Sequence, residues 1–215
     1  SLWVKGAWSQ GRSIQVGIWG GPQGEFIRRN VIPKFQQDFN CQIFAEEGTT
    51  LGQISRLRAT RSDPKYTVMF VDDLGVEIAK REDMTNPLPA DRMSNMRRVY
   101  PRFIYEEGHG VALAISTGGM FFNPTATPPL QSYETLWDRR FRQRLSLVST
   151  RNTPSVFVVI ATAALATGKS FQEAQYLADA AWPKPAELRP NVLNLYDSNN
   201  GAVFVAQGEA DIGGI

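Results

Sequence analysis

Residues 13–24 read SIQVGIWGGPQG, an alternating and largely apolar run that ends in a glycine-rich turn. The alternation predicts a β-strand over Ser13 to Trp19. After the turn, four apolar residues recur at every fourth position and predict a helix that has them on one face. These residues are Ile27, Val31, Phe35 and Phe39. We expect Pro33 to kink or split this helix, because proline cannot donate the backbone hydrogen bond that the position requires.

Two further strand–helix pairs follow. Cys41 to Ala45 predicts a short strand, and Thr50 to Gln53 resembles a capping box that opens a helix. Tyr66 to Val71 is a nearly continuous apolar run, typical of a strand buried on both faces of a parallel sheet, and Leu74 to Glu82 predicts the next helix. The alternation of strands and helices indicates an α/β fold with a parallel, doubly wound sheet.

Such a sheet binds ligands outside the carboxyl ends of its strands. That rule directs attention to three segments of the first half, residues 19–24, 46–50 and 72–73. Our candidate ligand-binding residues there are Trp19, Gly20, Gly21, Glu47, Thr49 and Asp72.

The choice among neighbours in these segments follows from capping and from strand geometry. Successive side chains of a strand point to opposite faces, so only one of Asp72 and Asp73 faces the ligand. Asp73 is placed to cap the following helix, which leaves Asp72 as the candidate. Thr50 is interpreted as a helix cap, which leaves Thr49 free to bind a ligand. Glu47 is equally interpretable as a solvated loop charge.

The glycine turn also permits an alternative function, that of a nucleotide-dependent α/β enzyme. A dinucleotide fingerprint requires G-x-G-x-x-G after the first strand. Aligned on Gly21 and Gly24, the first required glycine is Trp19, and Pro22 lacks a backbone N–H that would meet a phosphate. The match is therefore partial. The glycines are otherwise interpreted as a tight turn, or as a loop that lines a small-molecule site.

The second half repeats the α/β pattern after a proline-rich loop at residues 84–103 and strand segments at 110–116 and 120–123. It predicts helices at 132–137, 155–166, 170–181 and 201–207, and strands at 145–149, 191–196 and 210–215. We divide the chain into an N-terminal arm (1–12), a first lobe (13–117) and a second lobe (118–215), each lobe with a mostly parallel sheet. Because the last element is a strand, we expect both lobes to be incomplete.

Two polar loops in the second half complete the candidate site. Residues 149–153 precede a helix N-terminus, where backbone N–H groups and the helix dipole favour an anion. Arg151 adds a bidentate donor, and Thr153 is interpreted as the helix cap. The loop after residue 195 is either a turn or a second contact loop. The candidates are Ser149, Thr150, Arg151 and Tyr196. We interpret the arginine run at 139–144 as a solvated face.

The composition limits the classes of function. A single cysteine, Cys41, rules out an internal disulfide, and a single histidine, His109, leaves no Cys/His set for structural zinc. The net charge of +2 argues against nucleic acid as the main partner. The longest apolar run, Val156 to Ala166, is too short to span a bilayer. No apolar signal sequence opens the chain, so we expect any export signal to have been removed.

The ordered set of short segments resembles the extracellular solute-binding proteins of bacterial ABC importers, in the group with polyamine- and ferric-iron-binding members. The segments that carry the resemblance are Val16–Gly21, Glu47–Thr50, Val68–Leu74, Leu136–Asp138 with Phe141 and Leu145, and Gln207–Ile212. The resemblance implies a type II periplasmic-binding-protein fold with two α/β lobes and a ligand cleft between them.

The resemblance also implies a role. A small organic solute would be captured by hinge closure and delivered to an ABC permease in the inner membrane. We accordingly expect a periplasmic or extracellular monomer that is not an enzyme, uses no cofactor and binds no metal. An amine or amino-acid-like solute is favoured, with acidic groups and Trp19 facing a cation, and Arg151 facing an anion. Iron is disfavoured because family members bind it through tyrosines and Tyr196 has no neighbouring tyrosine.

Overall fold

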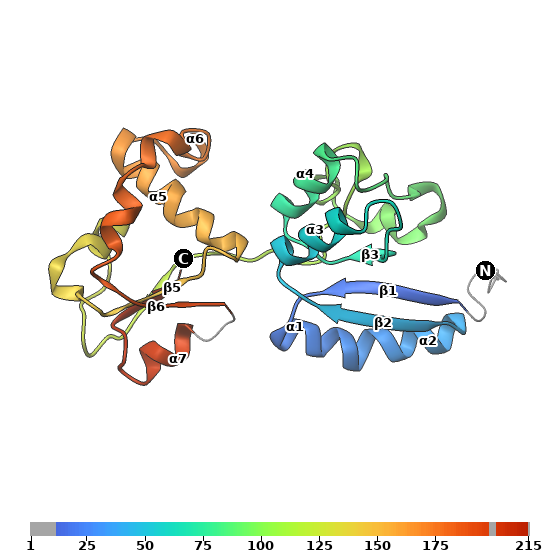
Figure 1. Ribbon diagram of the computed structural model, residues 1–215, viewed down its shortest axis with the longest axis horizontal. Helices are drawn as coiled ribbons and strands as arrows, with labels where there is room; N and C mark the ends of the chain where they lie inside the picture. The colour runs from blue at the N-terminus through green and yellow to red at the C-terminus, as the bar shows by residue number, and fades with distance from the viewer. Residues whose placement is uncertain (1–11, 198–200, 215) are drawn as a thin grey trace. The chain divides into compact units, whose positions relative to one another are not determined.

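A computed structural model of the chain describes residues 12–197 and 201–214. The chain divides into two compact units, Ser1–Ile115 and Ser116–Ile215; the sequence places this boundary after residue 117. The units are unit 1 and unit 2 below, and each is described by itself (Figure 1). The predicted N-terminal arm, residues 1–12, lies outside the described residues except for Arg12.

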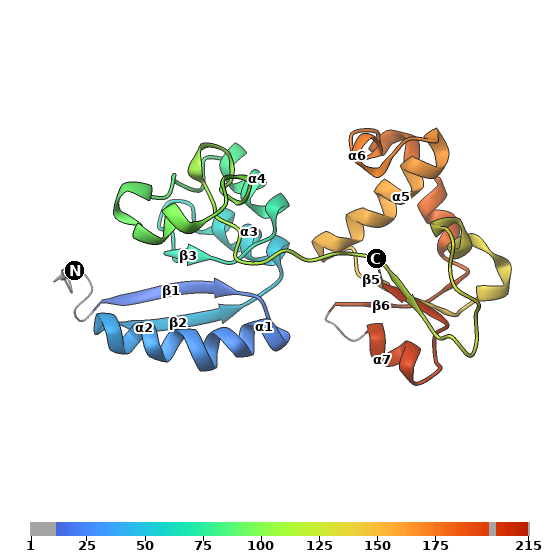
Figure 2. The same cartoon turned by 180° about the vertical axis from the view of Figure 1, so that it is seen from behind.

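Unit 1 is built on a parallel sheet with the strand order β2-β1-β3. Its strands are β1 (Ser13–Ile18), β2 (Gln42–Glu47) and β3 (Val68–Met69). Its α-helices are α1 (Gly21–Phe26), α2 (Ile32–Phe39), α3 (Thr50–Ala59) and α4 (Asp73–Arg81). The helices α1 and α2 cover one face of the sheet, and α3 and α4 lie on the other (Figures 1 and 2). The parallel α/β arrangement predicted for this half is confirmed.

The first helix shows the expected interruption at Pro33. A π-helical segment, Ile27–Val31, separates α1 from α2, and the proline lies in the first turn of α2. The hydrogen-bond pattern of this π-helical segment does not require the backbone N–H that proline lacks. Of the four apolar residues that predicted this helix, only Ile27 is buried. The rings of Phe35 and Phe39 pack on each other at 4.4 Å between centroids and remain partly exposed.

Two strand predictions in unit 1 are wrong. The run predicted to be buried on both faces forms only the two-residue β3, and Val68 is 52% exposed. The reason is that β3 is at the edge of the described sheet and pairs with β1 alone. The strand predicted at 110–116 reduces to one antiparallel bridge, Ile104 to Val111. Between α4 and that bridge the chain forms successive 3₁₀ turns at Ala90–Arg92, Ser94–Arg98 and Pro101–Phe103.

Unit 2 contains a sheet with the order β4-β7-β5-β6. Only β4 is antiparallel to its neighbour, so the sheet is mostly parallel, as predicted. The strands are β4 (Met120–Phe122), β5 (Leu145–Val148), β6 (Val192–Tyr196) and β7 (Ile212–Gly214). The α-helices are α5 (Val156–Thr167), α6 (Phe171–Ala174) and α7 (Gly201–Ala206), and 3₁₀ helices include η6 (Tyr133–Trp137), η7 (Arg139–Phe141), η9 (Ala178–Ala181) and η10 (Lys184–Leu188).

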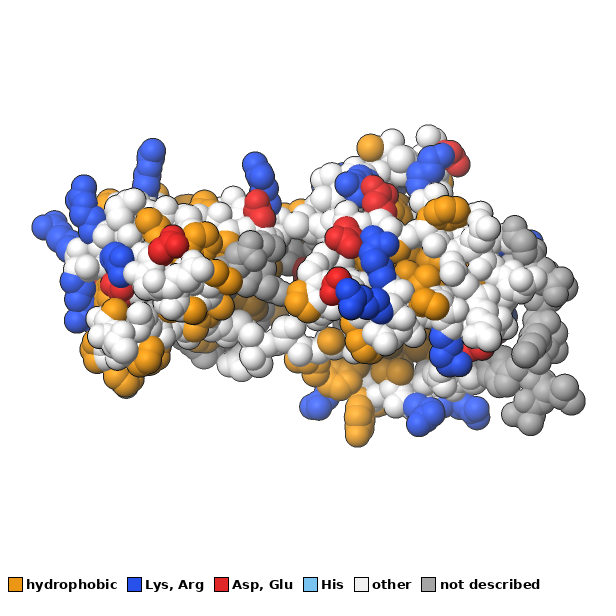
Figure 3. Space-filling view, turned by 90° about the horizontal axis from the view of Figure 1, so that it is seen from below, with side chains coloured by type: hydrophobic (Ala, Val, Ile, Leu, Met, Phe, Trp, Pro, Cys, Tyr) orange, Lys and Arg blue, Asp and Glu red, His pale blue; other side chains and the backbone are white. Residues whose placement is uncertain are grey.

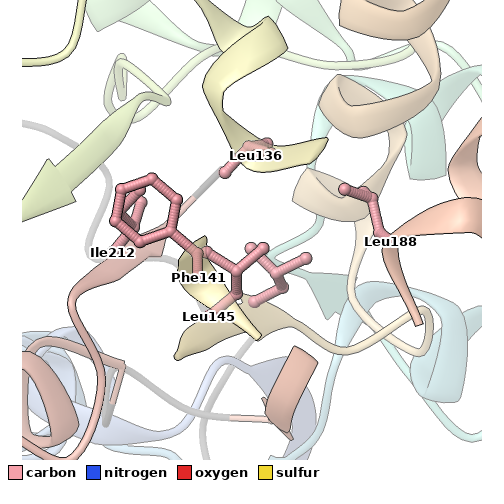
Figure 4. Packing of buried hydrophobic residues seen from close by; sticks show 6 residues of the cluster. Leu136, Phe141, Leu145, Leu188 and Ile212 are labelled. Atoms are coloured by element: carbon pink, nitrogen blue, oxygen red, sulfur yellow. The ribbon is translucent and has the colours of Figure 1, made fainter. Parts of the chain in front are cut away.

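The core of unit 2 joins β5 and β7 to the turns that precede β5 and β6. Its central side chains are Leu136, Phe141, Leu145, Leu188 and Ile212, none more than 3% exposed (Figure 4). The buried Asn191 ties these segments together, because its side-chain amide donates to the carbonyls of Leu136 (2.8 Å) and Asp138 (2.9 Å).

Two helix predictions in unit 2 need correction. The apolar character of α5 predicted a helix buried all round, yet Val156 and Phe157 are more than 40% exposed. The capping box of Ser170 and Glu173 is confirmed. The helix that it opens does not continue to Ala181, because α6 ends after one turn and a separate 3₁₀ helix, η9, follows.

Candidate functional site

In unit 1, polar side chains gather where β1 and β3 end. The hydroxyl of Thr50, in the first turn of α3, donates to Oδ2 of Asp72 (2.7 Å) and accepts from the backbone N–H of Asp72 (3.1 Å). The indole N–H of Trp19 donates to the same hydroxyl at 3.4 Å. The structure thus brings together two predicted residues, Trp19 and Asp72, through a threonine for which the sequence suggested only capping.

Close packing holds this cluster in place. Gln53 is fully buried, and its amide donates to the carbonyls of Ile18 (3.0 Å) and Gly48 (3.2 Å) at the ends of β1 and β2. Gly75 allows α4 to approach Thr50, because a Cβ at residue 75 would lie 2.5 Å from Thr50 Cγ2. The sequence signals for these contacts are a glutamine at the fourth position of α3 and a glycine at the third position of α4.

The capping predictions for this edge are wrong. Thr49, predicted to be free for a ligand, is the N-cap of α3, and its hydroxyl accepts from the N–H of Gly52 at 3.2 Å. Thr49 is extended, with φ −74° and ψ 158°, so the helix begins one residue later than a Thr50 cap requires. Asp73 is likewise the first residue of α4 and not its cap.

The two glutamates at the end of β2 have cationic partners. Glu47 forms an ion pair with Nε of Arg28 (2.9 Å), and Glu46 forms one with Arg56 (2.6 Å) and accepts from the phenol of Tyr66 (2.7 Å). Burial raises the pKa of Tyr66, and its hydrogen bond is the first cause of the raised pKa of Arg56. Glu47 lies beside Gly20, where a Cβ would be 3.2 Å from its Oε2, and its charge is balanced by that of Arg28.

The glycines of the first turn have structural tasks. The helix begins at Gly21, so the predicted glycine loop is the cap and first turn of α1 rather than a separate loop. Gly21 has φ +70°, a conformation that other residues rarely adopt. A Cβ at Gly24 would lie 2.1 Å from the carbonyl oxygen of Trp19. Gly24 therefore allows the helix to turn back closely on the end of β1.

In unit 2, the loops after β5 and β6 lie side by side. The N–H of Ser149 donates to the carbonyl of Tyr196 (2.9 Å), and the side chain of Asn152 donates to the carbonyl of Asp197 (2.7 Å). Arg151 lies 3.7 Å from the Asp197 carboxylate, and its side chain is 81% exposed. The predicted residues Ser149, Arg151 and Tyr196 thus share one edge of the sheet, at the carboxyl ends of its strands.

The hydroxyl of Ser149 accepts from the N–H of Arg151 (3.3 Å), and Thr150 is exposed in the same turn. Thr153 was predicted to cap the next helix. The structure instead places Thr153 in a 3₁₀ turn, Thr153–Ser155, whose N-cap is Asn152, and the N-cap of α5 is Ser155.

Tyr196 is half-buried, and its ring packs on the start of α7. A Cβ at Gly201 would lie 2.3 Å from the tyrosine ring, so only glycine allows this approach. Burial raises the pKa of Tyr196 above its ordinary value. The remainder of the predicted loop, residues 198–200, lies outside the described residues.

Within residues 12–197 and 201–214, no three His, Cys, Asp or Glu side chains are grouped as a metal site would require. In the same part of the chain, no helix has the length and apolar character needed to cross a membrane.

Comparisons with known proteins identify the fold. The chain is similar to the periplasmic binding protein AfuA from Actinobacillus pleuropneumoniae, whose structure contains fructose-6-phosphate, with a TM-score of 0.73 and 16% identity over 94% of this chain. It is similar to an ABC transporter protein from Clostridium perfringens, with a TM-score of 0.66 and 19% identity over 94% of this chain. It is also similar to the spermidine/putrescine substrate-binding protein PotD from Streptococcus pneumoniae, with a TM-score of 0.61 and 15% identity.

The chain therefore has the α/β fold of the type II periplasmic solute-binding proteins of ABC transporters, as the sequence resemblance implied. It spans 63% of the length of AfuA and of the Clostridium protein, and 62% of the length of PotD. Neither a protein-family model nor a curated protein matches the sequence.

Proposed function

We propose that this chain is the solute-binding part of an ABC import system. The fold supports this proposal, since its structural neighbours are substrate-binding transport proteins. The single observation that carries it is the cluster of Trp19, Thr50 and Asp72 at the carboxyl edge of the unit 1 sheet, where parallel α/β sheets bind ligands.

The solute that we propose is a small organic amine or an amino-acid-like molecule. Asp72 supplies a carboxylate beside the Trp19 ring, a combination that attracts an ammonium group through charge and cation–π contact. In unit 2, the exposed guanidinium of Arg151 suits a carboxylate. A zwitterion would use both sets of groups.

The proposed mechanism is hinge closure. A solute that contacts the polar edge of unit 1 and that of unit 2 makes all of its contacts only in the closed state, and this shifts the population toward that state. A permease of the inner membrane would then bind the closed form. We further propose that the protein acts as a monomer in the periplasm or outside the cell. No bond is made or broken.

The alternative, a nucleotide-dependent enzyme that uses the Gly20–Gly24 turn, has less support. Gly21 and Gly24 are accounted for by backbone conformation and close packing. Pro22 lies in the first turn of α1, so that helix N-terminus has one N–H fewer for a phosphate.

Calorimetry tests the proposal with four probes: putrescine, a neutral α-amino acid, fructose-6-phosphate and NADH. We expect saturable binding of putrescine or of the amino acid, weakened at least about tenfold by Asp72→Asn, because a charge-assisted hydrogen bond contributes about 1.5–3 kcal/mol. Asp73→Asn is the matched control and leaves the affinity unchanged. Binding of NADH alone would support the enzyme instead. Binding of fructose-6-phosphate that depends on Arg151 would retain the transport role but refute the amine.

A further inference from the structure

A second charged feature of unit 2 lies at the amino ends of β5 and β6, opposite the candidate site at their carboxyl ends. Arg139 and Arg142 belong to the turn that enters β5, and Arg189 belongs to the turn that enters β6. The candidate ligand residues instead follow the carboxyl ends of the same two strands. Because β5 and β6 are parallel, the two sets lie at the two ends of the sheet. We call the three arginines the basic surface.

Hydrogen bonds between the two entering turns bring the arginines together. The backbone N–H of Gln143 donates to the carbonyl of Pro190 (3.1 Å), and its side-chain amide donates to the carbonyls of Pro190 (3.2 Å) and Val192 (2.9 Å). Asn191 joins the same turns from the buried side. Arg189 is thus fixed close to Arg142, although 47 positions separate Pro190 from Gln143 in the sequence.

The charge of the basic surface is not neutralised within unit 2. Arg140 is paired with Asp138 (3.1 Å) and lies over the Phe141 ring, and Arg144 is paired with Asp211 (2.5 Å). Among the described residues, Arg139, Arg142 and Arg189 take part in no ion pair, and all three are exposed. Figure 3 shows Lys and Arg side chains gathered at the left-hand end of unit 2, with few Asp or Glu side chains near them.

Aromatic side chains accompany this charge. Trp182 is 59% exposed in the connection that leads to Lys184 and Arg189. The ammonium group of Lys184 lies 5.2 Å from the centre of the Trp137 ring, and the indole of Trp137 donates to the Lys184 carbonyl. Lys184 is also paired with Glu187 (3.5 Å), so the unpaired charge here is that of the three arginines. An exposed tryptophan in the same connection favours a lipid interface, where indole rings lie at the level of the headgroups.

We propose that the basic surface binds an anionic phospholipid membrane. Guanidinium groups match phosphate geometry, and cations near an anionic bilayer each strengthen binding severalfold. Since the surface and the candidate site lie at opposite ends of the sheet, unit 2 would bind lipid without covering its solute-binding residues. This proposal is independent of the identity of the solute.

Vesicle co-sedimentation tests it with the full chain at low salt. The vesicles are phosphatidylcholine alone, or phosphatidylcholine with about 30% phosphatidylglycerol. We expect binding only to the anionic vesicles, and its loss at about 0.5 M salt, where surface charges are screened. A test variant replaces Arg139, Arg142 and Arg189 with alanine, and we expect it to bind about 100-fold more weakly, at roughly fivefold for each arginine.

A control variant removes the same number of charges from unit 1, by replacing the exposed Arg92, Arg97 and Arg98 with alanine. We expect it to bind like the unmodified chain. Equal loss in both variants would reduce the effect to net charge and overturn the proposal. Absence of binding to the anionic vesicles would also overturn the proposal. That result is expected if these arginines bind an acidic protein instead. Should the test variant fail to fold, Arg142→Glu alone, with circular dichroism as a check, gives the same decision.

Discussion

The hydroxyl of Thr50 donates a hydrogen bond to Oδ2 of Asp72 at 2.7 Å and accepts one from the backbone N–H of the same residue at 3.1 Å. This reciprocal pair joins the start of α3 to the residue that precedes α4. It fixes the Asp72 carboxylate beside Trp19, whose indole shares the same hydroxyl. The strongest candidate for contact with a cationic solute is therefore oriented by a side chain that is only 2% exposed.

Replacing Thr50 with valine should weaken unit 1. The change keeps the shape of the side chain but removes the donor to the Asp72 carboxylate, so we expect the free energy of unfolding to fall by about 1–2 kcal/mol. Urea denaturation measures the difference. Thr67→Val, at an exposed position, is the control and should remain within about 0.5 kcal/mol of the parent. Equal stability of the two variants would show that the Thr50 pair is not significant.

Gly24→Ala should destabilise the chain because a Cβ there would lie 2.1 Å from a backbone oxygen, that of Trp19. Relief requires movement of α1 away from the end of β1, at a cost of about 1–3 kcal/mol. Gly119→Ala is the matched control, since nothing lies within 4 Å of a Cβ at that position. Thermal unfolding compares the two variants. A neutral effect of Gly24→Ala would contradict the close approach of α1 to the end of β1.

Asn191→Ala should destabilise unit 2. It removes the side-chain donor to the Leu136 carbonyl and one of the two donors to the Asp138 carbonyl, which still accepts from the N–H of Phe141 at 3.1 Å. The expected loss is about 1–3 kcal/mol, the range for unsatisfied buried groups. Asn30→Ala, which removes an exposed donor to the Phe26 carbonyl, should cost less than about 0.5 kcal/mol. Denaturant titration distinguishes the two outcomes, and comparable losses would contradict the assignment.

Tyr196 should not bind ferric iron at neutral pH. Burial raises the pKa of its phenol, so the group remains protonated over a wider pH range than an exposed tyrosine, and the phenolate that iron requires is disfavoured. We expect ferric citrate to produce no visible charge-transfer absorbance with the unmodified chain. An absorbance band that appears with iron and disappears in Tyr196→Phe would refute this prediction.

Periodicity and turn chemistry predicted most elements of the fold. The alternation in β1, the capping box of Ser170 and Glu173, and the effect of Pro33 all depend on neighbours along the chain. The errors have tertiary causes. The β3 segment is apolar enough for a central strand, yet it pairs only with β1 in the described sheet. The apolar α5 is uncovered on part of its surface for the same kind of reason, since burial depends on what packs against a helix.

The candidate site, like the fold, was predictable from the sequence only in part. The rule that ligands bind beyond the carboxyl ends of parallel strands predicted Trp19 and Asp72 as ligand-binding candidates, and the structure brings the two together through Thr50. The exchange of roles between Thr49 and Thr50 was not predictable, because two adjacent threonines are equally good caps. The choice depends on Asp72, which is distant in sequence and near in space.

Native mass spectrometry of the purified chain, with a denatured control, tests whether the protein binds a small cationic solute. We predict a small organic adduct that is present in the native spectrum and lost on denaturation, with a mass in the range of an amine or an amino acid. Its occupancy should fall in Asp72→Asn and persist in Asp73→Asn. A nucleotide mass would contradict the proposed solute-binding function. So would a bare chain that also binds none of the amine or amino-acid probes in solution.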